Sequence, residues 1–201
     1  MQRFISTVLF TAALSLTAGC NSTPKNTAST AGTTAPAQSQ QNTFSDNELV
    51  TAVSTHLGVT SESAATAIER LFKDKGRPVG YITGEEGGGA FTVGARYGKG
   101  TLWMKNGETR KVYWQGPTVG FDIGAEASKV FTLVYNLDDA DLIYRRYPGV
   151  DGSAFLVAGM AVNYQRGNGI TLAPVRSGVG VRLGANVGYT SYTRNRSLIP
   201  L

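Results

Sequence analysis

The sequence predicts a mainly β protein: a small soluble closed β-barrel of about eight strands, with two N-terminal helices and one short inserted helix. Twenty-five of the 201 residues are glycine, and most of these lie between Gly76 and Gly188. In the same region the apolar pattern changes from a helical period to the period of two that is typical of strands. Charged residues make up only 16% of the chain and hydrophobic residues 41%. This composition excludes a disordered chain, for which high charge and low hydrophobicity are typical.

Residues 1–19 have the pattern of an export signal. Arg3 gives a positive start, and residues 4–18 form an apolar stretch that is too short to span a bilayer. The stretch leads to Leu16-Thr17-Ala18-Gly19-Cys20, which is similar to the cleavage site of bacterial lipoproteins, although Thr17 departs from the leucine preferred there. Cys20 is the only cysteine, so it cannot form an intrachain disulfide. We therefore expect Cys20 to be acylated and to become the new N-terminus.

The residue after Cys20 bears on the location of the protein. It is Asn21 rather than aspartate, which favours an anchor in the periplasmic face of the outer membrane. The alternative is a soluble periplasmic protein released from an ordinary secretory signal. Residues 20–44 form the expected tether, because residues 21–43 contain no aromatic or large aliphatic side chain and a single charge, Lys25. Its root-mean-square reach as a flexible coil is roughly 25–30 Å.

Residues 45–76 are predicted to hold two helices. Ser45 and Glu48 have the spacing of a capping box, and apolar residues follow at helical spacing until Gly58. A second amphipathic pattern runs over residues 62–75, and Gly76 suits the position after a helix C-terminus. Such apolar stripes most often pack on their own domain, so the helices are expected to cover the barrel.

Residues 77–201 are predicted to form the barrel. Apolar residues alternate with glycine or charged residues over 91–98, 119–124 and 179–189, the pattern of a half-buried strand with one apolar face. Glycine permits the sharp bending that a small barrel needs. Most of the expected strands are near six residues, shorter than the 9–11 of a membrane-spanning strand, which favours a soluble barrel.

Sequence patterns also predict the connections between the strands of the barrel. Asn106-Gly107 and Gly167-Asn168-Gly169 predict two hairpins. Residues 131–136 are apolar on both faces, which indicates a strand that lies under a helix. Residues 137–147 are predicted to be a short helix capped by Asp138 or Asp139.

No residue pattern in the chain indicates an enzyme, a metal site or a cofactor. One cysteine and one histidine, His56, cannot build a zinc site of the usual kind. The run Gly87-Gly88-Gly89 lacks the lysine and the hydroxyl residue of a phosphate-binding loop, so it is read as a turn. Glu85 and Glu86 are adjacent in an extended segment and are expected to point to opposite faces.

Several segments, in matching order, resemble the EipA family of periplasmic envelope-integrity proteins. They cover residues about 45–192 and include YITGEEGGGAF, RYG with GTL, VYWQGP with GFD, LVYNL, and RSGVG through GY. The resemblance implies a soluble eight-stranded β-barrel and a role in envelope integrity, and it carries over no catalytic residue. A weaker similarity, through the WQGP segment and the glycine-alternating strands, extends to the lipid-binding SYLF domain, some members of which bind anionic lipids.

Arginines are the main candidates for ligand binding, because a guanidinium binds phosphate through two hydrogen bonds. The candidate residues are Arg145, Arg146, Arg176 and Arg182, together with Trp114 and Asp122. If several arginines share one face, they fit anionic lipid or lipopolysaccharide. Asp122 is expected on the non-apolar face of its strand, either exposed or paired with Arg96 or Arg182. Export makes nucleic acid an implausible partner, and the net charge of +5 is too mild to indicate one.

Two classes of function therefore compete. The first is a non-enzymatic, periplasm-facing lipoprotein that contributes to envelope integrity by holding an anionic lipid or a partner in the envelope. The second is an enzyme that acts on envelope polymers. Such an enzyme needs two carboxylates about 5–10 Å apart across a cleft, and Glu86 with Asp122 is the candidate pair.

Overall fold

A computed structural model describes residues 42–91, 93–119, 128–150, 153–177 and 188–197. All of these residues belong to one compact unit of the chain. The predictions made for Cys20, Asp122 and Arg182 lie outside the described residues, as do the signal peptide and nearly all of the tether. Among the described residues, no helix combines the length and the apolar character needed to cross a membrane.

Two helices come first, as predicted. Helix α2 spans Asp46–Leu57, and the carboxylate of Glu48 accepts a hydrogen bond from the backbone N–H of Ser45 (2.8 Å), which completes the expected capping box. The helix ends at Gly58 in the left-handed conformation, with φ of 69°. Helix α3 spans Ser61–Lys75 and is capped by the hydroxyl of Thr60, which accepts a hydrogen bond from the N–H of Ser63.

Ten strands of the described chain form one sheet. Nine of them follow the order β5-β10-β3-β2-β1-β4-β9-β7-β6, and β8 pairs with β9 beside this path. Every pairing is antiparallel. The strands are β1 Gly80–Phe91, β2 Val93–Met104, β3 Thr109–Val119, β4 Ser128–Tyr135, β5 Arg146–Pro148, β6 Phe155–Val157, β7 Met160–Val162, β8 Gln165–Gly167, β9 Ile170–Ser177 and β10 Tyr189–Thr193.

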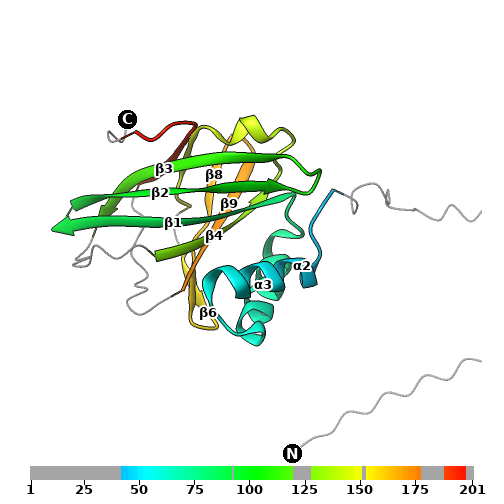
Figure 1. Ribbon diagram of the computed structural model, residues 1–201. Helices are drawn as coiled ribbons and strands as arrows, with labels where there is room; N and C mark the ends of the chain where they lie inside the picture. Colours follow the sequence, from blue (N-terminus) through cyan, green and yellow to red (C-terminus); the bar gives the residue numbers. More distant parts are fainter. Residues whose placement is uncertain (1–41, 92, 120–127, 151–152, 178–187, 198–201) are drawn as a thin grey trace, which may run out of the picture. The chain divides into compact units, whose positions relative to one another are not determined.

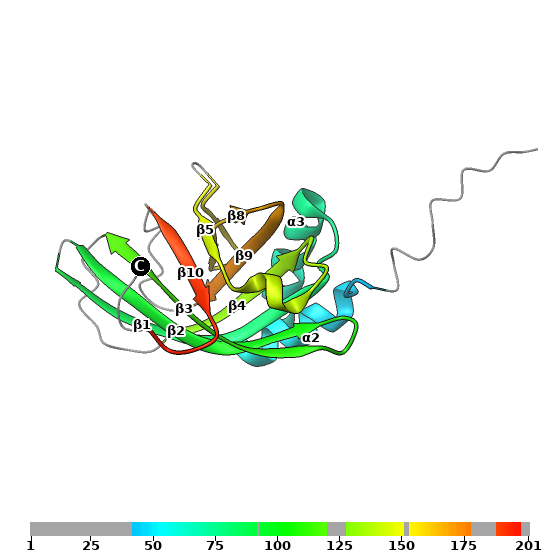
Figure 2. The same ribbon diagram turned by 90° about the horizontal axis from the view of Figure 1, so that it is seen from above.

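The sheet curls into a half-barrel (Figures 1 and 2). The prediction of a mainly β, barrel-like fold is confirmed, but the prediction of a closed barrel is wrong for the part of the chain described here. The two sides of the curl approach each other where β8 lies beside the end of β5, and they meet there in one isolated bridge, Gly149 with Gln165. Because β5 and β8 have three residues each, they are too short to add a continuous ladder. The strand expected over 179–189 is described only from Tyr189 onward, in β10.

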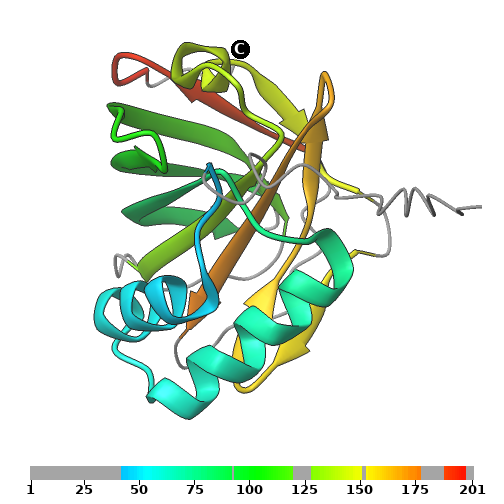
Figure 3. The same ribbon diagram turned by 90° about the vertical axis from the view of Figure 1, so that its right-hand side faces the viewer.

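Two hydrophobic cores lie on opposite faces of this sheet. The outer core lies between the two helices and the outer face of β4, β9 and β7, where α2 and α3 cover the sheet (Figure 3). β4 is buried on both faces, as the apolar segment 131–136 predicts. The second, which we call the inner core, lies on the concave side of the curl. Its members include Ile82, Leu102, Val112, Trp114, Val134, Leu172 and Tyr192.

The face of β1 and β2 that carries the alternating glycines is the inner face, whereas the sequence predicted that the apolar residues between them would be buried. On β2 the alternating pattern assigned Ala95 and Tyr97 to the buried face, but Arg96 is the buried residue and its two neighbours are only half-buried. The physical reason is the indole of Trp114, which lies against Gly84 of β1 and Gly98 of β2. A side chain of that size fits the concave side only where the facing residues have no Cβ.

The turns follow the sequence in most places. The hairpin at Asn106-Gly107 joins β2 to β3, and Asn168 and Gly169, both at positive φ, join β8 to β9. The predicted helix over 137–147 is shorter than expected: it is a 3-10 turn over Ala140–Ile143, capped by Asp139. β1, β2 and β3 have 12, 12 and 11 residues, about twice the expected length.

Candidate ligand-binding site

Three charged side chains lie on the concave side of the half-barrel, because side chains alternate between the two faces of a strand. Glu86 lies four residues after Ile82 on β1, so it shares the inner face with that core residue. In the same way, Arg176 lies four residues after the core residue Leu172 on β9. Arg96 lies on β2 directly across from Gly88 of β1, so it shares the inner face with Glu86. Three strands thus bring together residues that are far apart in the sequence.

Glu86 and Arg176 form a buried ion pair. Arg176 Nε lies 2.5 Å from Glu86 Oε1, and Nη2 lies 3.3 Å from Oε2, so the guanidinium binds the carboxylate through two hydrogen bonds. The side chains are 17% and 9% exposed, respectively. The indole Nε1 of Trp114 donates a third hydrogen bond to Glu86 Oε2, at 3.0 Å. The carboxylate is therefore fixed by two residues from two other strands.

This arrangement keeps Glu86 ionised. Burial alone would raise the pKa of Glu86, but the charge and hydrogen bonds of Arg176 outweigh it, with help from Arg96 and Trp114, and lower the pKa to about 2. The same carboxylate raises the pKa of Arg176 against the opposing effect of burial. Burial and the nearby charge of Arg176 lower the pKa of Arg96.

Polar side chains surround the ion pair, and three of their buried atoms, Arg96 Nε among them, lack a hydrogen-bond partner in the described structure. Arg96 Nη2 and Gln165 Nε2 both donate to the hydroxyl of Thr190, at 2.6 and 2.9 Å. Asn163 Oδ1 accepts a hydrogen bond from Arg176 Nη1 at 3.0 Å. Asn163 Nδ2 and Gln165 Oε1 are buried without a hydrogen-bond partner among the described residues. Buried polar atoms are rarely left unsatisfied.

We call this group of residues the inner polar cluster, and its members are Glu86, Arg96, Trp114, Asn163, Gln165, Arg176 and Thr190. Its described members include one carboxylate and two guanidinium groups. A carboxylate with a pKa near 2 is a poor general acid or base at neutral pH. The carboxylate is therefore suited to a structural, hydrogen-bonded role rather than to moving a proton.

The predicted site residues do not share one face. Trp114 and Arg176 meet in the inner polar cluster through Glu86. Arg146 lies on the outer face, because the next residue, Tyr147, belongs to the inner core; its guanidinium lies 4.8 Å from the ring centroid of Tyr189. Arg145 precedes β5, and its Nε is buried without a hydrogen-bond partner in the described part of the chain. As stated above, Arg182 and Asp122 lie outside the described residues.

Sequence reasoning missed several members of the inner polar cluster. No sequence pattern pointed to Asn163 or Gln165, and Glu86 was considered only as a catalytic carboxylate, with Glu85 or with Asp122. The expectation that Glu85 and Glu86 point to opposite faces is confirmed, since Glu85 is exposed and Glu86 is buried. The contacts of His56 are with the backbone of the sheet: its Nε2 lies 3.2 Å from the backbone N of Gly84 and within 3.1 Å of the carbonyl oxygen of Val130.

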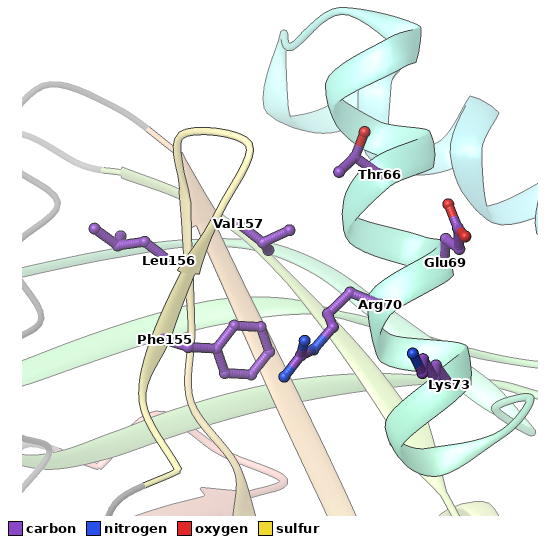
Figure 4. A pocket seen from close by; sticks show the side chains of 7 residues that line it. All are labelled: Thr66, Glu69, Arg70, Lys73, Phe155, Leu156 and Val157. Atoms are coloured by element: carbon purple, nitrogen blue, oxygen red, sulfur yellow. The ribbon is translucent and has the colours of Figure 1, made fainter.

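A second concave region lies between α3 and the hairpin of β6 and β7 (Figure 4). It is an open cleft of about 440 Å³ whose walls come from one helix and one hairpin. Thr66, Glu69, Arg70 and Lys73 line one side, and Phe155, Leu156 and Val157 line the other. The guanidinium of Arg70 lies 5.6 Å from the ring centroid of Phe155. None of the predicted site residues lines this cleft.

The comparisons with known proteins agree on the fold. Residues 42–201 match the family described as envelope integrity protein A. A similar solved structure is that of a β-barrel-like, uncharacterised protein from Brucella abortus. It is 45% identical in sequence with a TM-score of 0.72, and the match covers 80% of this chain and 99% of that one. No curated protein matches the sequence.

Proposed function

The chain belongs to the envelope integrity protein A family, and from this premise we propose that it supports the cell envelope as a non-enzymatic protein that binds an anionic ligand. The ligand lies in the concave side of the half-barrel, at the inner polar cluster. An acyl anchor on Cys20 holds the protein at the periplasmic face of the outer membrane. The proposed ligand carries a phosphate or a carboxylate, as anionic lipids and lipopolysaccharide do.

The observation that carries this proposal is a buried donor that lies beside the ion pair without a partner. Asn163 Nδ2 is buried without a hydrogen-bond partner among the described residues, and Asn163 Oδ1 accepts a hydrogen bond from Arg176. A buried donor without an acceptor is costly. An oxygen atom of an anionic ligand can accept from Asn163 Nδ2 close to the guanidinium of Arg176, which supports a ligand of this kind.

The state of Glu86 supports a non-enzymatic function. In the rival function Glu86 would act with Asp122 on an envelope polymer, and one carboxyl group of such a pair must hold a proton near neutral pH. Glu86 is bound by Arg176 and Trp114, and its pKa is lowered to about 2. The family and the related structure indicate no enzyme class either.

The test of ligand binding is complementation of a strain that lacks the gene, scored as survival under envelope stress. Asn163→Leu removes the unpartnered donor and should abolish rescue. Asn163→Gln keeps a side-chain amide and should preserve at least part of it. Arg77→Gln removes an exposed arginine that pairs with Asp46 and serves as the control. Equal rescue by Asn163→Leu and Arg77→Gln, with both proteins folded, would refute the proposal.

The anchor has a separate test. In Cys20→Ser no thioether can form, so the protein should leave the membrane fraction and appear in the periplasmic extract. Two acyl chains give stable membrane attachment, at about 0.8 kcal/mol per buried methylene, so the loss should be nearly complete. Unchanged membrane fractionation of Cys20→Ser would contradict the anchor and leave the ligand-binding proposal untouched. A wild-type protein already found in the periplasmic extract would favour the soluble alternative.

A further inference from the structure

We propose that the cleft between α3 and β6 is a docking site for an extended peptide segment of a partner protein, which adds a strand to the edge of β6 and presents an acidic side chain to α3. The cleft shares no residue with the inner polar cluster, so the inference goes beyond the proposed function and does not depend on it. It rests on the strand edge, on an exposed apolar wall and on a facing wall that holds two cationic side chains.

The backbone of β6 has an open edge. Within the described part of the chain, β6 is the last strand of the sheet order and pairs with β7 alone. The loop between them, Ala158 and Gly159, has two positive φ angles, 47° and 78°, as in a two-residue hairpin. In such a hairpin the pair that flanks the loop, Val157 with Met160, exchanges both backbone hydrogen bonds, and the next pair along the ladder exchanges none. The N–H and C=O of Leu156 therefore point away from β7, toward the open edge.

The wall of the cleft that β6 provides is apolar. Phe155 and Val157 point toward α3, and Leu156 points away from the helix (Figure 4). Leu156 is 56% exposed, the highest value among the large hydrophobic residues that the structure describes. β6 contains no charged residue and no proline, the residues that commonly discourage pairing at an edge. An extended chain beside β6 would cover this apolar surface.

The facing wall is one stripe of α3. Thr66, Glu69, Arg70 and Lys73 have the spacing i, i+3, i+4 and i+7, so they share one side of the helix over about 10 Å. Arg70 Nε lies 3.2 Å from Asp74 Oδ2, so this guanidinium already has a carboxylate partner. No carboxylate among the described residues pairs with Lys73. Its ammonium group is therefore available to an acidic side chain of the docked segment.

These features together select an extended peptide. The cleft volume of about 440 Å³ is large enough for side chains of a ligand, and only a peptide also pairs with the N–H and C=O of Leu156. Residues i and i+2 of a strand face the same side, so an apolar and an acidic side chain two positions apart reach Phe155 and Lys73. Because β6 has only three residues, the backbone supplies few hydrogen bonds and these two side chains supply most of the specificity.

The experiment selects peptides from a random display library, with the full chain purified in a non-ionic detergent as the target. The enriched peptides should share an apolar and an acidic residue at positions i and i+2. One enriched peptide is then compared, by fluorescence polarisation, with two versions that are N-methylated at alternate residues. Only the version whose methylated groups face β6 should lose affinity, by about 2-fold to 10-fold for each hydrogen bond. A peptide bound as a helix would show no such alternation.

Variants of the chain test the two walls separately. Leu156→Pro removes the N–H that faces the edge and no bond of the ladder with β7, so it should weaken the peptide more than Leu156→Ala, the matched control that keeps this N–H. Lys73→Glu should reverse the selected charge, so that basic residues replace acidic ones in the enriched peptides. Lys111→Glu changes an exposed lysine of β3 and should leave the selection unchanged. The fold of each variant is checked by circular dichroism.

Several results would overturn the inference. They are the absence of any enriched peptide, an equal loss of affinity in both N-methylated versions, and the same selected charge for Lys73→Glu as for the wild-type chain. A wild-type dimer that Leu156→Pro converts to a monomer would show that a second copy of the chain occupies the edge, which also overturns it. None of these results bears on the anionic ligand of the inner polar cluster, which Asn163→Leu tests separately.

Discussion

Replacing Gly98 by alanine tests how Trp114 is held on the concave side. A Cβ at Gly98 would lie closer than 3.0 Å to three indole atoms of Trp114, namely Cε2, Cζ2 and Nε1, whereas ordinary contact begins near 3.4 Å. The backbone of Gly98 is not in the left-handed region, so alanine is allowed there and the cost is steric alone. The indole must move, and its hydrogen bond to Glu86 is then lost.

The expected cost has two parts. Overpacking a dense core costs about 1–3 kcal/mol, and losing a buried hydrogen bond to a charged group costs about 1.5–3 kcal/mol. Gly98→Ala should therefore lower the free energy of unfolding by about 3–5 kcal/mol, a large part of the stability of a typical domain. The measurement is urea unfolding followed by far-ultraviolet circular dichroism.

The control is a double-mutant cycle with Trp114→Leu. The smaller side chain removes the clash and the hydrogen bond, so Gly98→Ala should cost less than about 1 kcal/mol in that background. The interaction energy should then exceed 1 kcal/mol, as it does for residues in direct contact. An equal cost of Gly98→Ala in both backgrounds would show that Trp114 is not what requires glycine at this position.

Three further predictions concern charge and capping. The pKa of Glu86 is lowered from 4.5 to about 2, so its ion pair stabilises the fold by about 3 kcal/mol above pH 4.5. This stabilisation is lost as the pH falls through 2. Acid unfolding of Glu86→Gln, followed by circular dichroism, should lack this component. Arg176→Met leaves Glu86 buried without its partner and should cost about 3–5 kcal/mol in urea unfolding, whereas Arg70→Met, which breaks the exposed pair with Asp74, should cost less than about 1 kcal/mol. Thr60→Ala removes the cap of α3 and should lower the midpoint of thermal unfolding, with a cost of about 1 kcal/mol; an unchanged midpoint would contradict the capping contact.

Features that depend on neighbouring residues were predictable from the sequence. The capping box of Ser45 and Glu48 placed the start of α2, and Asn106-Gly107 placed the hairpin between β2 and β3. The two apolar faces of β4 indicated its position under a helix. In each case the signal lies within a few residues of the structure that it determines.

Features that depend on pairs distant in sequence were not predictable. Glu86 and Arg176 are 90 positions apart, and only the strand order brings them together. The buried face of β2 was misassigned because glycine usually indicates an exposed or turning position. Here it marks the place where an indole from β3 contacts the sheet. A single sequence does not show which tryptophan lies over which glycine.

The two tryptophans of the chain provide an optical signal without any label. Trp114 is buried and its Nε1 is bonded to Glu86, so its emission should change in wavelength or intensity when a ligand alters the field around that carboxylate. Trp103 is 41% exposed and donates to Thr83 at the surface, so its emission gives a constant background. Titrations of the intact protein can therefore be followed by intrinsic fluorescence, with Trp103→Phe isolating the signal from the interior.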